Sequence, residues 1–144
     1  MSNVESPQLR LQRQIDCQIE AKTKDPLIEW EKADWAEDPG TDADEAPLKY
    51  LALVLLEAIE SRSVRLSIDK DKGVTILGDS TYVLPKAPAA YIARGLEILR
   101  DIAGMEGGNA QGRIALGIRN DSLDLIIQKE AGLHIINIPG VSPV

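Results

Sequence analysis

The sequence predicts an α+β domain in which two main helices cover an antiparallel sheet of about five strands, in the order α-β-β-α-β-β-β. Apolar residues recur at helical spacing in two segments, 47–59 and 88–103. Other short runs alternate apolar and polar residues, and turn sequences such as DKDKG, RNDS and KEAG separate them. Successive hairpins of this kind favour a single antiparallel sheet with its helices packed on one face.

Residues 1–45 differ in composition from the rest of the chain and are predicted to form an acidic arm or linker that is partly disordered or docks on a partner. The stretch WAEDPGTDADEAP is charged and interrupted by proline and glycine, and it lacks the apolar content that ordering requires. Leu11, Ile15 and Ile19 recur every four residues, which predicts a short amphipathic helix that is marginal in isolation. The α+β domain itself is expected to span residues 46–144.

Both tryptophans of the chain lie in this arm, within the acidic sequence PLIEWEKADW. Leu27, Trp30 and Trp35 among acidic residues form a pattern typical of docking segments that become ordered on a partner. Trp30 and Trp35 are therefore candidate partner-binding residues. The alternative interpretation is that the tryptophans cover an edge of their own domain, and the sequence pattern is compatible with both.

The segment that begins at Pro47 is predicted to be the first main helix, because a proline suits the first helical turn. One apolar stripe runs along it, formed by Leu48, Leu51, Ala52, Leu55, Leu56 and Ile59. Leu53 and Val54 lie off this stripe, so the helix is either covered on both sides within the domain or presents a second apolar face to another protein. Leu53 and Val54 are therefore further candidate partner-binding residues.

The remaining elements follow in order along the chain. SVRLSID and VTILG are predicted to form an antiparallel hairpin, and DSTYVL to add a brief third strand or an edge. The second main helix, KAPAAYIARGLEILRDIAGM, has Pro88 near its start. Gly95 inside this helix costs about 1 kcal/mol relative to alanine, which is tolerable where another backbone packs closely. RIALGI, LDLIIQ and LHIINI then complete the sheet as a meander.

Composition and charge disfavour several classes of partner. The chain has 16 basic and 23 acidic residues, and its net charge of −7 without a basic cluster disfavours nucleic acids and anionic membranes. The longest apolar run, YLALVLLEAI, is much shorter than the roughly 20 residues that a membrane span needs. Because Cys17 is the single cysteine and the N-terminus has no apolar core of signal-peptide type, we expect a cytoplasmic location.

The sequence shows no recognisable catalytic or metal-binding pattern. His134 is the single histidine, and it is far from Cys17 in the chain, so no metal site is predicted. The serines lack the G-x-S-x-G pattern of hydrolases. The glycine-rich stretch GMEGGNAQGRI matches no nucleotide-binding loop and leads into a strand, where it lacks the helix N-terminus that binds phosphate. We therefore expect neither enzyme activity nor a cofactor.

Three stretches, LKYLALVLLEAIESRSVRLSID, GLEILRDIAG and QGRIALGI, together resemble a known family. They look like the small PAS-like domain that precedes the motor domain in the ATPases of type II secretion and type IV pilus assembly. The resemblance covers residues 46–138. Leu55 to Ile59 match the family's "ILLEAI"-like helix face, Asp101 to Ala103 match "DIA", and Gly112 to Ile114 match "GRI".

The resemblance implies a non-catalytic interaction or regulatory domain that docks on a motor or assembly protein. In the family, arginines of this domain reach toward nucleotide held by the motor domain, and Arg113 is the one position here that matches such an arginine. The sequence departs from the family in three ways. At the matching positions, SVRLSIDK lacks the Asp, His and Pro of the family's "ASDIHIEP" strand. Met105 and Glu106 stand in place of an arginine pair, and no Walker A loop is present. The structural alternative is that Arg113 caps its loop or pairs with Asp124 across the hairpin.

Two other functions are compatible with the sequence. A stand-alone regulatory domain of roadblock or PAS-sensor type, acting as a homodimer or sensing a small ligand, has the same two-helix, five-strand count, so topology alone does not separate it from the first hypothesis. An enzyme would require Arg113, His134 and acids such as Asp121 or Asp124 to converge in one cleft.

Overall fold

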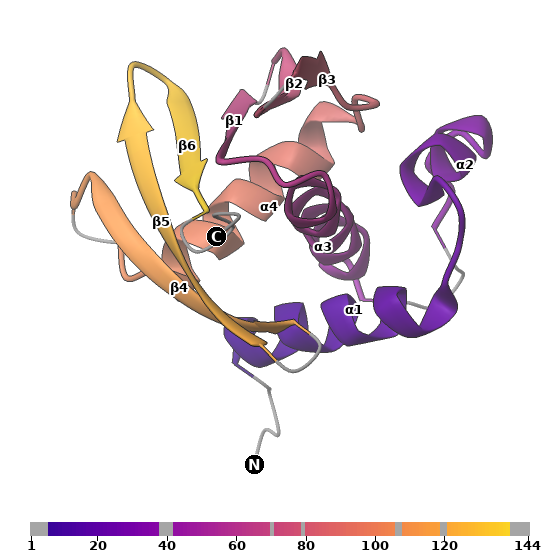
Figure 1. The fold of residues 1–144 in the computed structure, drawn as a ribbon, viewed down its shortest axis with the longest axis horizontal. Coiled ribbons are helices and arrows are strands. Elements are labelled where there is room, and N and C mark those ends of the chain that lie inside the picture. Colours follow the sequence, from indigo (N-terminus) through magenta and orange to yellow (C-terminus); the bar gives the residue numbers. More distant parts are fainter. Residues whose placement is uncertain are drawn as a thin grey trace.

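The computed structural model describes residues 6–37, 42–69, 71–78, 80–105, 108–118 and 121–138. Within these ranges the elements are α1 (Pro7–Ala21), α2 (Pro26–Lys32), α3 (Glu45–Glu60), β1 (Arg65–Asp69), β2 (Gly73–Leu77), β3 (Thr81–Val83), α4 (Ala89–Ile102), β4 (Gln111–Ile118), β5 (Asp121–Glu130) and β6 (Leu133–Asn137) (Figure 1). The predicted α+β class with an antiparallel sheet is confirmed. The described chain has six strands rather than about five, because DSTYVL contributes β3, and α1 and α2 add to the two predicted main helices.

All six strands form one antiparallel sheet in the order β3-β2-β1-β6-β5-β4. β1 and β6 pair at its centre and join the two three-stranded meanders. The register places Leu66 opposite both Ile76 and Ile136, and it places Ile136 opposite Ile127. Each of these four side chains is fully buried. The alternation of strand residues therefore directs one row of aliphatic side chains across the sheet toward the helices.

Helix α3 lies among the other three helices on the covered side of the sheet (Figure 1). Its buried residues are Ala46, Pro47, Leu48, Tyr50, Leu51, Ala52, Leu53, Val54, Leu55, Leu56 and Ala58. They occupy all sides of the helix, as expected for a helix that is apolar all round. α4 packs on one side of α3, and α1 and α2 pack on others. The off-stripe residues Leu53 and Val54 are therefore covered within the chain.

Helix α1 belongs to the core, although it comes from the segment predicted to be an arm. Its N-cap is Ser6, whose hydroxyl accepts a hydrogen bond from the backbone N–H of Leu9. Leu11 and Ile15 are fully buried, and the helix packs across α3. The predicted helical stripe is thus present, and the tertiary contact with α3 supplies the stability that a short helix lacks alone.

The side-chain amides of α1 also cover the free edge of β4. Gln12 Nε2 donates to the Gly117 carbonyl at 2.7 Å, and the Gly117 N–H donates to Gln12 Oε1 at 2.8 Å. One turn earlier, Gln8 Nε2 donates to the Ala115 carbonyl at 2.9 Å. These amides make the hydrogen bonds that a neighbouring strand would make, so they satisfy backbone groups at the edge of the sheet.

An aromatic cluster fixes α2 against α3 and α4. The ring of Trp30 stacks on Tyr91 at 5.8 Å and meets Trp35 edge-on at 5.2 Å, and Trp35 meets Tyr50 edge-on at 5.8 Å. Trp30 Nε1 donates to the Ala36 carbonyl, and the Tyr91 hydroxyl donates to the Trp35 carbonyl. Both tryptophans are buried within their own chain. Residues 38–41 of the predicted linker lie outside the described residues.

Two glycines allow close packing between elements. A Cβ on Gly95 of α4 would lie 3.3 Å from Leu51 Cγ of α3, so a side chain, rather than the expected backbone, packs closely there. A Cβ on Gly112 of β4 would lie 2.5 Å from the Ala103 carbonyl oxygen and 2.7 Å from Met105 Cγ. The chain just after α4 therefore packs directly onto the backbone of β4.

The contact at Gly112 predicts that Gly112→Ala destabilises the fold by about 1 to 3 kcal/mol, the usual range for overpacking a core. The added methyl group must displace the backbone after α4, because the nearest atom is a carbonyl oxygen. Urea unfolding measures the change. Gly117→Ala is the matched control in the same strand, since the nearest atoms to its Cβ belong to the Gln12 side chain and lie no closer than 3.7 Å. Equal stability of the two variants would contradict the close contact.

Candidate functional site

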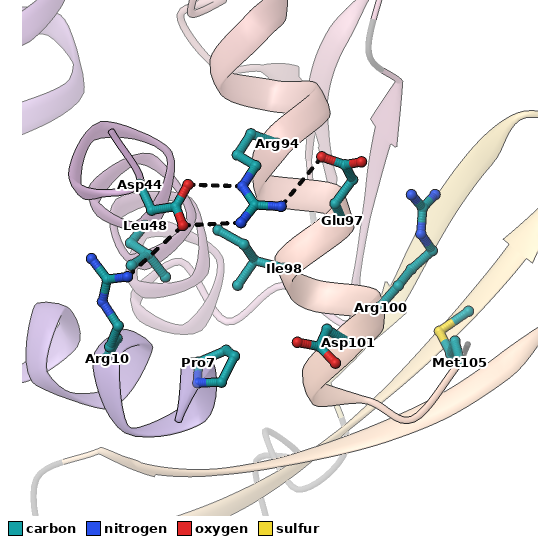
Figure 2. Close-up of a pocket in the computed structure, with 10 residues that line it drawn as sticks. All are labelled: Pro7, Arg10, Asp44, Leu48, Arg94, Glu97, Ile98, Arg100, Asp101 and Met105. Atoms are coloured by element: carbon teal, nitrogen blue, oxygen red, sulfur yellow. Dashed lines mark hydrogen bonds and ion pairs between the residues drawn. The ribbon is translucent and has the colours of Figure 1, made fainter. Parts of the chain in front are cut away.

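Two hollows in the described part of the chain are candidates for a functional site. The first, which we name the charged cleft, has a volume of about 450 Å³ and lies between α1, the start of α3 and α4 (Figure 2). Its lining residues are Pro7, Arg10, Asp44, Leu48, Arg94, Glu97, Ile98, Arg100, Asp101 and Met105. Three arginines and three carboxylates therefore line this cleft, and the interactions that each makes decide whether any is available for chemistry.

Asp44 is the centre of an ion-pair network in this cleft. The Arg94 guanidinium binds it with two contacts, Nε to Oδ1 at 2.8 Å and Nη2 to Oδ2 at 3.0 Å, and Arg10 Nη1 lies 3.8 Å from Oδ2. The hydrogen bonds from Arg94 lower the pKa of the Asp44 carboxyl, and the charges of Arg94 and Arg10 add to this effect. Arg94 also contacts Glu97 at 3.5 Å. The network joins α1, α3 and α4 and leaves Asp44 ionised.

Arg100 lines the cleft, but its guanidinium points away from the ion-pair network (Figure 2) and toward β6. Its Nη1 lies 3.2 Å from Nε2 of His134, which is only 4% exposed. Because arginine can only donate, Nε2 accepts, and the proton of the neutral imidazole lies on Nδ1. Nδ1 is buried and has no hydrogen-bond partner among the described residues.

Burial, together with the positive charges of Arg100 and Lys129, lowers the pKa of His134 to about 4. The imidazole is therefore neutral near pH 7 and enclosed by protein. Among the described residues, no three His, Cys, Asp or Glu side chains are placed to hold a metal ion together. This histidine thus supports packing and a hydrogen bond to Arg100.

Arg113, the candidate nucleotide contact, lies away from the charged cleft. It is exposed on β4, opposite Ile126 of β5. No ion pair joins it to Asp124 among the contacts between described residues, so the pairing predicted across the hairpin is not formed. Met105, at the position of the family's arginine pair, is buried, and Glu106 lies outside the described residues. A nucleotide contact by Arg113 stays a prediction.

The grouping that an enzyme would require is not formed by the described residues. His134 faces the helices and is buried, whereas Arg113 and Asp124 are exposed on their strands. The side chain of Asp121 lies outside the described residues. Arg113 and His134 therefore do not share a cleft.

The second hollow, which we name the apolar groove, has a volume of about 360 Å³. It lies between the end of α1, α2, α3 and the segment from β3 to α4, and its lining residues are Gln18, Ile19, Lys22, Thr23, Asp25, Pro26, Leu27, Ile28, Leu53, Leu56, Glu57, Glu60, Tyr82, Val83, Leu84 and Pro85. Leu53 and Leu56 contribute from α3, and Ile28 of α2 is 44% exposed at one side. Val83 borders the groove at the edge of β3, where it is 64% exposed and, opposite Thr75, lies on the sheet face away from the helices. The charged residues of the lining are Lys22, Asp25, Glu57 and Glu60.

Sequence reasoning found one residue of the apolar groove and missed others. Leu53 was a candidate because it lies off the helical stripe, and it is buried yet lines the groove. Ile28 and Val83 had no distinguishing signal, since single apolar residues in short segments are common. Partner binding by Trp30, Trp35 and Val54 stays a prediction, and in this structure all three side chains are buried in the core.

Comparison with models of known protein families and with curated proteins found no match to this chain. Among the described residues, no helix combines the length and the apolar character that crossing a membrane demands. The choice between the two hollows therefore depends on their geometry and chemistry.

The ion-pair network predicts that Asp44→Asn lowers the free energy of unfolding at pH 7 by about 0.5 to 1 kcal/mol, because the lost carboxylate binds Arg94 at two atoms but solvent screens the half-exposed guanidinium. The pKa of Asp44 is lower in the folded than in the unfolded chain. Its stabilisation is therefore complete above the unfolded pKa and is lost as pH falls through the folded pKa. Urea unfolding at several pH values should show the difference between wild type and variant shrinking below about pH 4.

Asp101→Asn is the matched control, since Asp101 lines the same cleft without a role in the network. A constant difference between wild type and Asp44→Asn down to pH 2 would contradict the assignment.

The environment of His134 predicts a second pH effect. Its pKa is about 4 in the folded chain against 6.5 ordinarily, so the unfolded chain takes up a proton between these values and the folded chain does not. The wild type should therefore lose stability as pH falls from 6.5 to 4, and His134→Gln should show a shallower slope over that interval. Urea unfolding gives the slope, and an imidazole NMR titration gives the pKa directly. A titration midpoint near 6.5 in the folded chain would refute this prediction.

Proposed function

We propose that this chain is a non-catalytic protein-interaction domain and that a partner protein docks in the apolar groove. The observation that carries the proposal is the pairing of an apolar floor with exposed apolar sides. Large exposed apolar side chains in the described chain are Leu9, Ile28, Val64 and Val83, and two of these four flank the groove. Contiguous apolar surface of this kind is a usual feature of protein-binding sites.

The chemistry of the charged cleft supports a structural role for that hollow. Asp44, Arg94 and Arg10 are committed to one another across three helices, and Arg100 is directed to the buried His134. Ionised groups held in mutual pairs stabilise the helix packing and are poor acids and bases near neutral pH. The apolar groove is therefore the better candidate for binding.

The resemblance to the accessory domain of type II secretion and type IV pilus ATPases indicates what kind of partner to test first. The chain order α3-β1-β2-α4-β4-β5-β6, with β3 as an addition, supports it. On this basis the partner is a motor or assembly protein in the cytoplasm. The exposed guanidinium of Arg113 is then the group that would approach a nucleotide held by that partner.

A second candidate function is a stand-alone homodimeric regulatory domain of roadblock or PAS type. It is favoured by the sheet face opposite the helices, where Ile126 and Ile135 are only half-buried. Light scattering of the purified chain tests this candidate. A dimer that Ile126→Lys converts to a monomer would favour self-association through this face.

Docking in the apolar groove predicts that Val83→Asp strongly reduces partner capture. The wild-type chain, immobilised in a lysate of its own source cells, should retain a protein that mass spectrometry identifies. Val83→Asp should reduce its recovery at least about tenfold, because Val83 borders the groove at the edge of β3 and a carboxylate covered there by the partner must be desolvated without a counter-charge. Val64→Asp is the matched control, as Val64 is 61% exposed and does not line the groove.

Equal recovery with both variants would contradict docking in the groove. If the protein that depends on Val83 is a secretion or pilus component, the resemblance gains support. If the protein that depends on Val83 belongs to an unrelated system, the inference drawn from the resemblance is overturned and docking in the groove still stands.

A further inference from the structure

We propose that the docking segment of the partner is a short extended peptide, basic at its ends, that adds to the sheet as a new strand along β3. This inference rests on the proposed function, because it names what occupies the apolar groove. It depends on three features of the described residues: the unpaired backbone of β3, the position of the groove beside that strand, and the charge of the groove lining.

The outer edge of β3 has backbone groups available for pairing. The Leu84 N–H donates to the Val74 carbonyl at 2.9 Å, and Tyr82 lies opposite Ile76. Hydrogen-bonding direction alternates along an antiparallel strand, so the backbone groups of Thr81 and Val83 point away from β2. Both residues are exposed, and no described residue makes a hydrogen bond to these outward groups.

The two edges of the sheet differ in how they are covered. At β4, the amides of Gln8 and Gln12 hydrogen-bond to outward carbonyls, and Gln12 also accepts from an N–H. At β3, the apolar groove lies next to the strand, and residues 82–85 form one of its sides. Strand addition to a sheet edge is a common mode of peptide binding, and its specificity comes from pockets for alternate side chains.

The groove can receive the side chains of an added strand. Such a strand lies about 4.8 Å from β3, and its side chains alternate between the two faces of the sheet. On the helix side the neighbours are Leu53 and Leu56 of α3, with Leu27 and Ile28 of α2 beyond them. Apolar residues at alternate positions of the peptide therefore fit the floor of the groove.

The charge of the lining favours a basic peptide. The lining carries one ammonium group, Lys22, against the carboxylates of Asp25 and Glu57, so acidic groups outnumber basic ones there. The Tyr82 hydroxyl donates to Glu57 at 2.8 Å and holds this carboxylate beside β3. Together with the net charge of −7, this arrangement attracts lysine or arginine at the ends of the bound segment.

The experiment uses the full chain labelled with ¹⁵N and a capped hexapeptide probe of lysine, isoleucine, threonine, valine, threonine and lysine. On titration, the amide signals of Thr81 and Val83 should shift and exchange more slowly with solvent. The Tyr82 amide is the internal control, because it already faces β2. Replacing both peptide lysines by glutamate should weaken binding at least about fivefold at low ionic strength, with a smaller effect at high salt.

Two further peptides, each N-methylated on one set of alternate residues, distinguish strand addition from other binding. One set of peptide amides faces β3 and the other faces away, so one methylated peptide should lose binding and the other should keep it. If both bind, or if signals of Ile28 and Leu56 shift without protection of Thr81 and Val83, the groove binds the peptide without strand addition. That outcome overturns this inference and leaves the proposed function standing.

Absence of binding by every peptide, in a chain whose partner capture still depends on Val83, would also overturn the inference, since the groove then takes a segment of another kind. A helical partner segment or a second copy of this chain would be the occupant in that case. Failure of the proposed function is a separate result. In that case Val83→Asp would capture as much of the partner as the wild type does.

Discussion

The structure depends on the burial of α3 on all its sides. Leu51 and Leu55 on one face and Leu53 and Val54 on another are all withdrawn from water. A sheet can cover only one side of such a helix, so other elements must cover the rest. At about 25 cal/mol per Å² of apolar area, exposing a second face of α3 would cost several kcal/mol. The N-terminal segment folds onto α3 because this face requires cover.

Directional ion pairs and aromatic contacts fix the positions of the covering helices, while the burial of apolar side chains stabilises their packing. Arg10 approaches Asp44 at the start of α3, and Arg94 of α4 binds the same carboxylate. At the other covering helix, Trp30 and Trp35 meet aromatic rings of α3 and α4. A directional contact at each position limits how α1 and α2 can slide over an otherwise uniform aliphatic surface.

The sequence predicted the elements well and their tertiary contacts poorly, for identifiable reasons. Helical and alternating periodicity are local signals, and they revealed both main helices, the hairpins and the unusual second face at Leu53 and Val54. The pairing of Arg94 with Asp44 joins residues 50 positions apart, and no local pattern encodes it. No local pattern encodes the hydrogen bond between Arg100 and His134 either. Arg113 is a different case: the alternation of Ile114 and Leu116 already indicated a strand face directed away from the core.

The glutamine contacts at β4 have a consequence for assembly. An α-helix contributes no strand, so α1 ends the sheet on that side without offering a new backbone edge of its own. Without α1, the sheet would have pairing-competent backbone at both β4 and β3. Copies of such a chain could join head to tail through unlike edges, and a contact of that kind closes into a ring only at particular rotations and otherwise grows into a fibre. By covering β4, Gln8 and Gln12 remove one of the two unlike edges that such head-to-tail pairing needs.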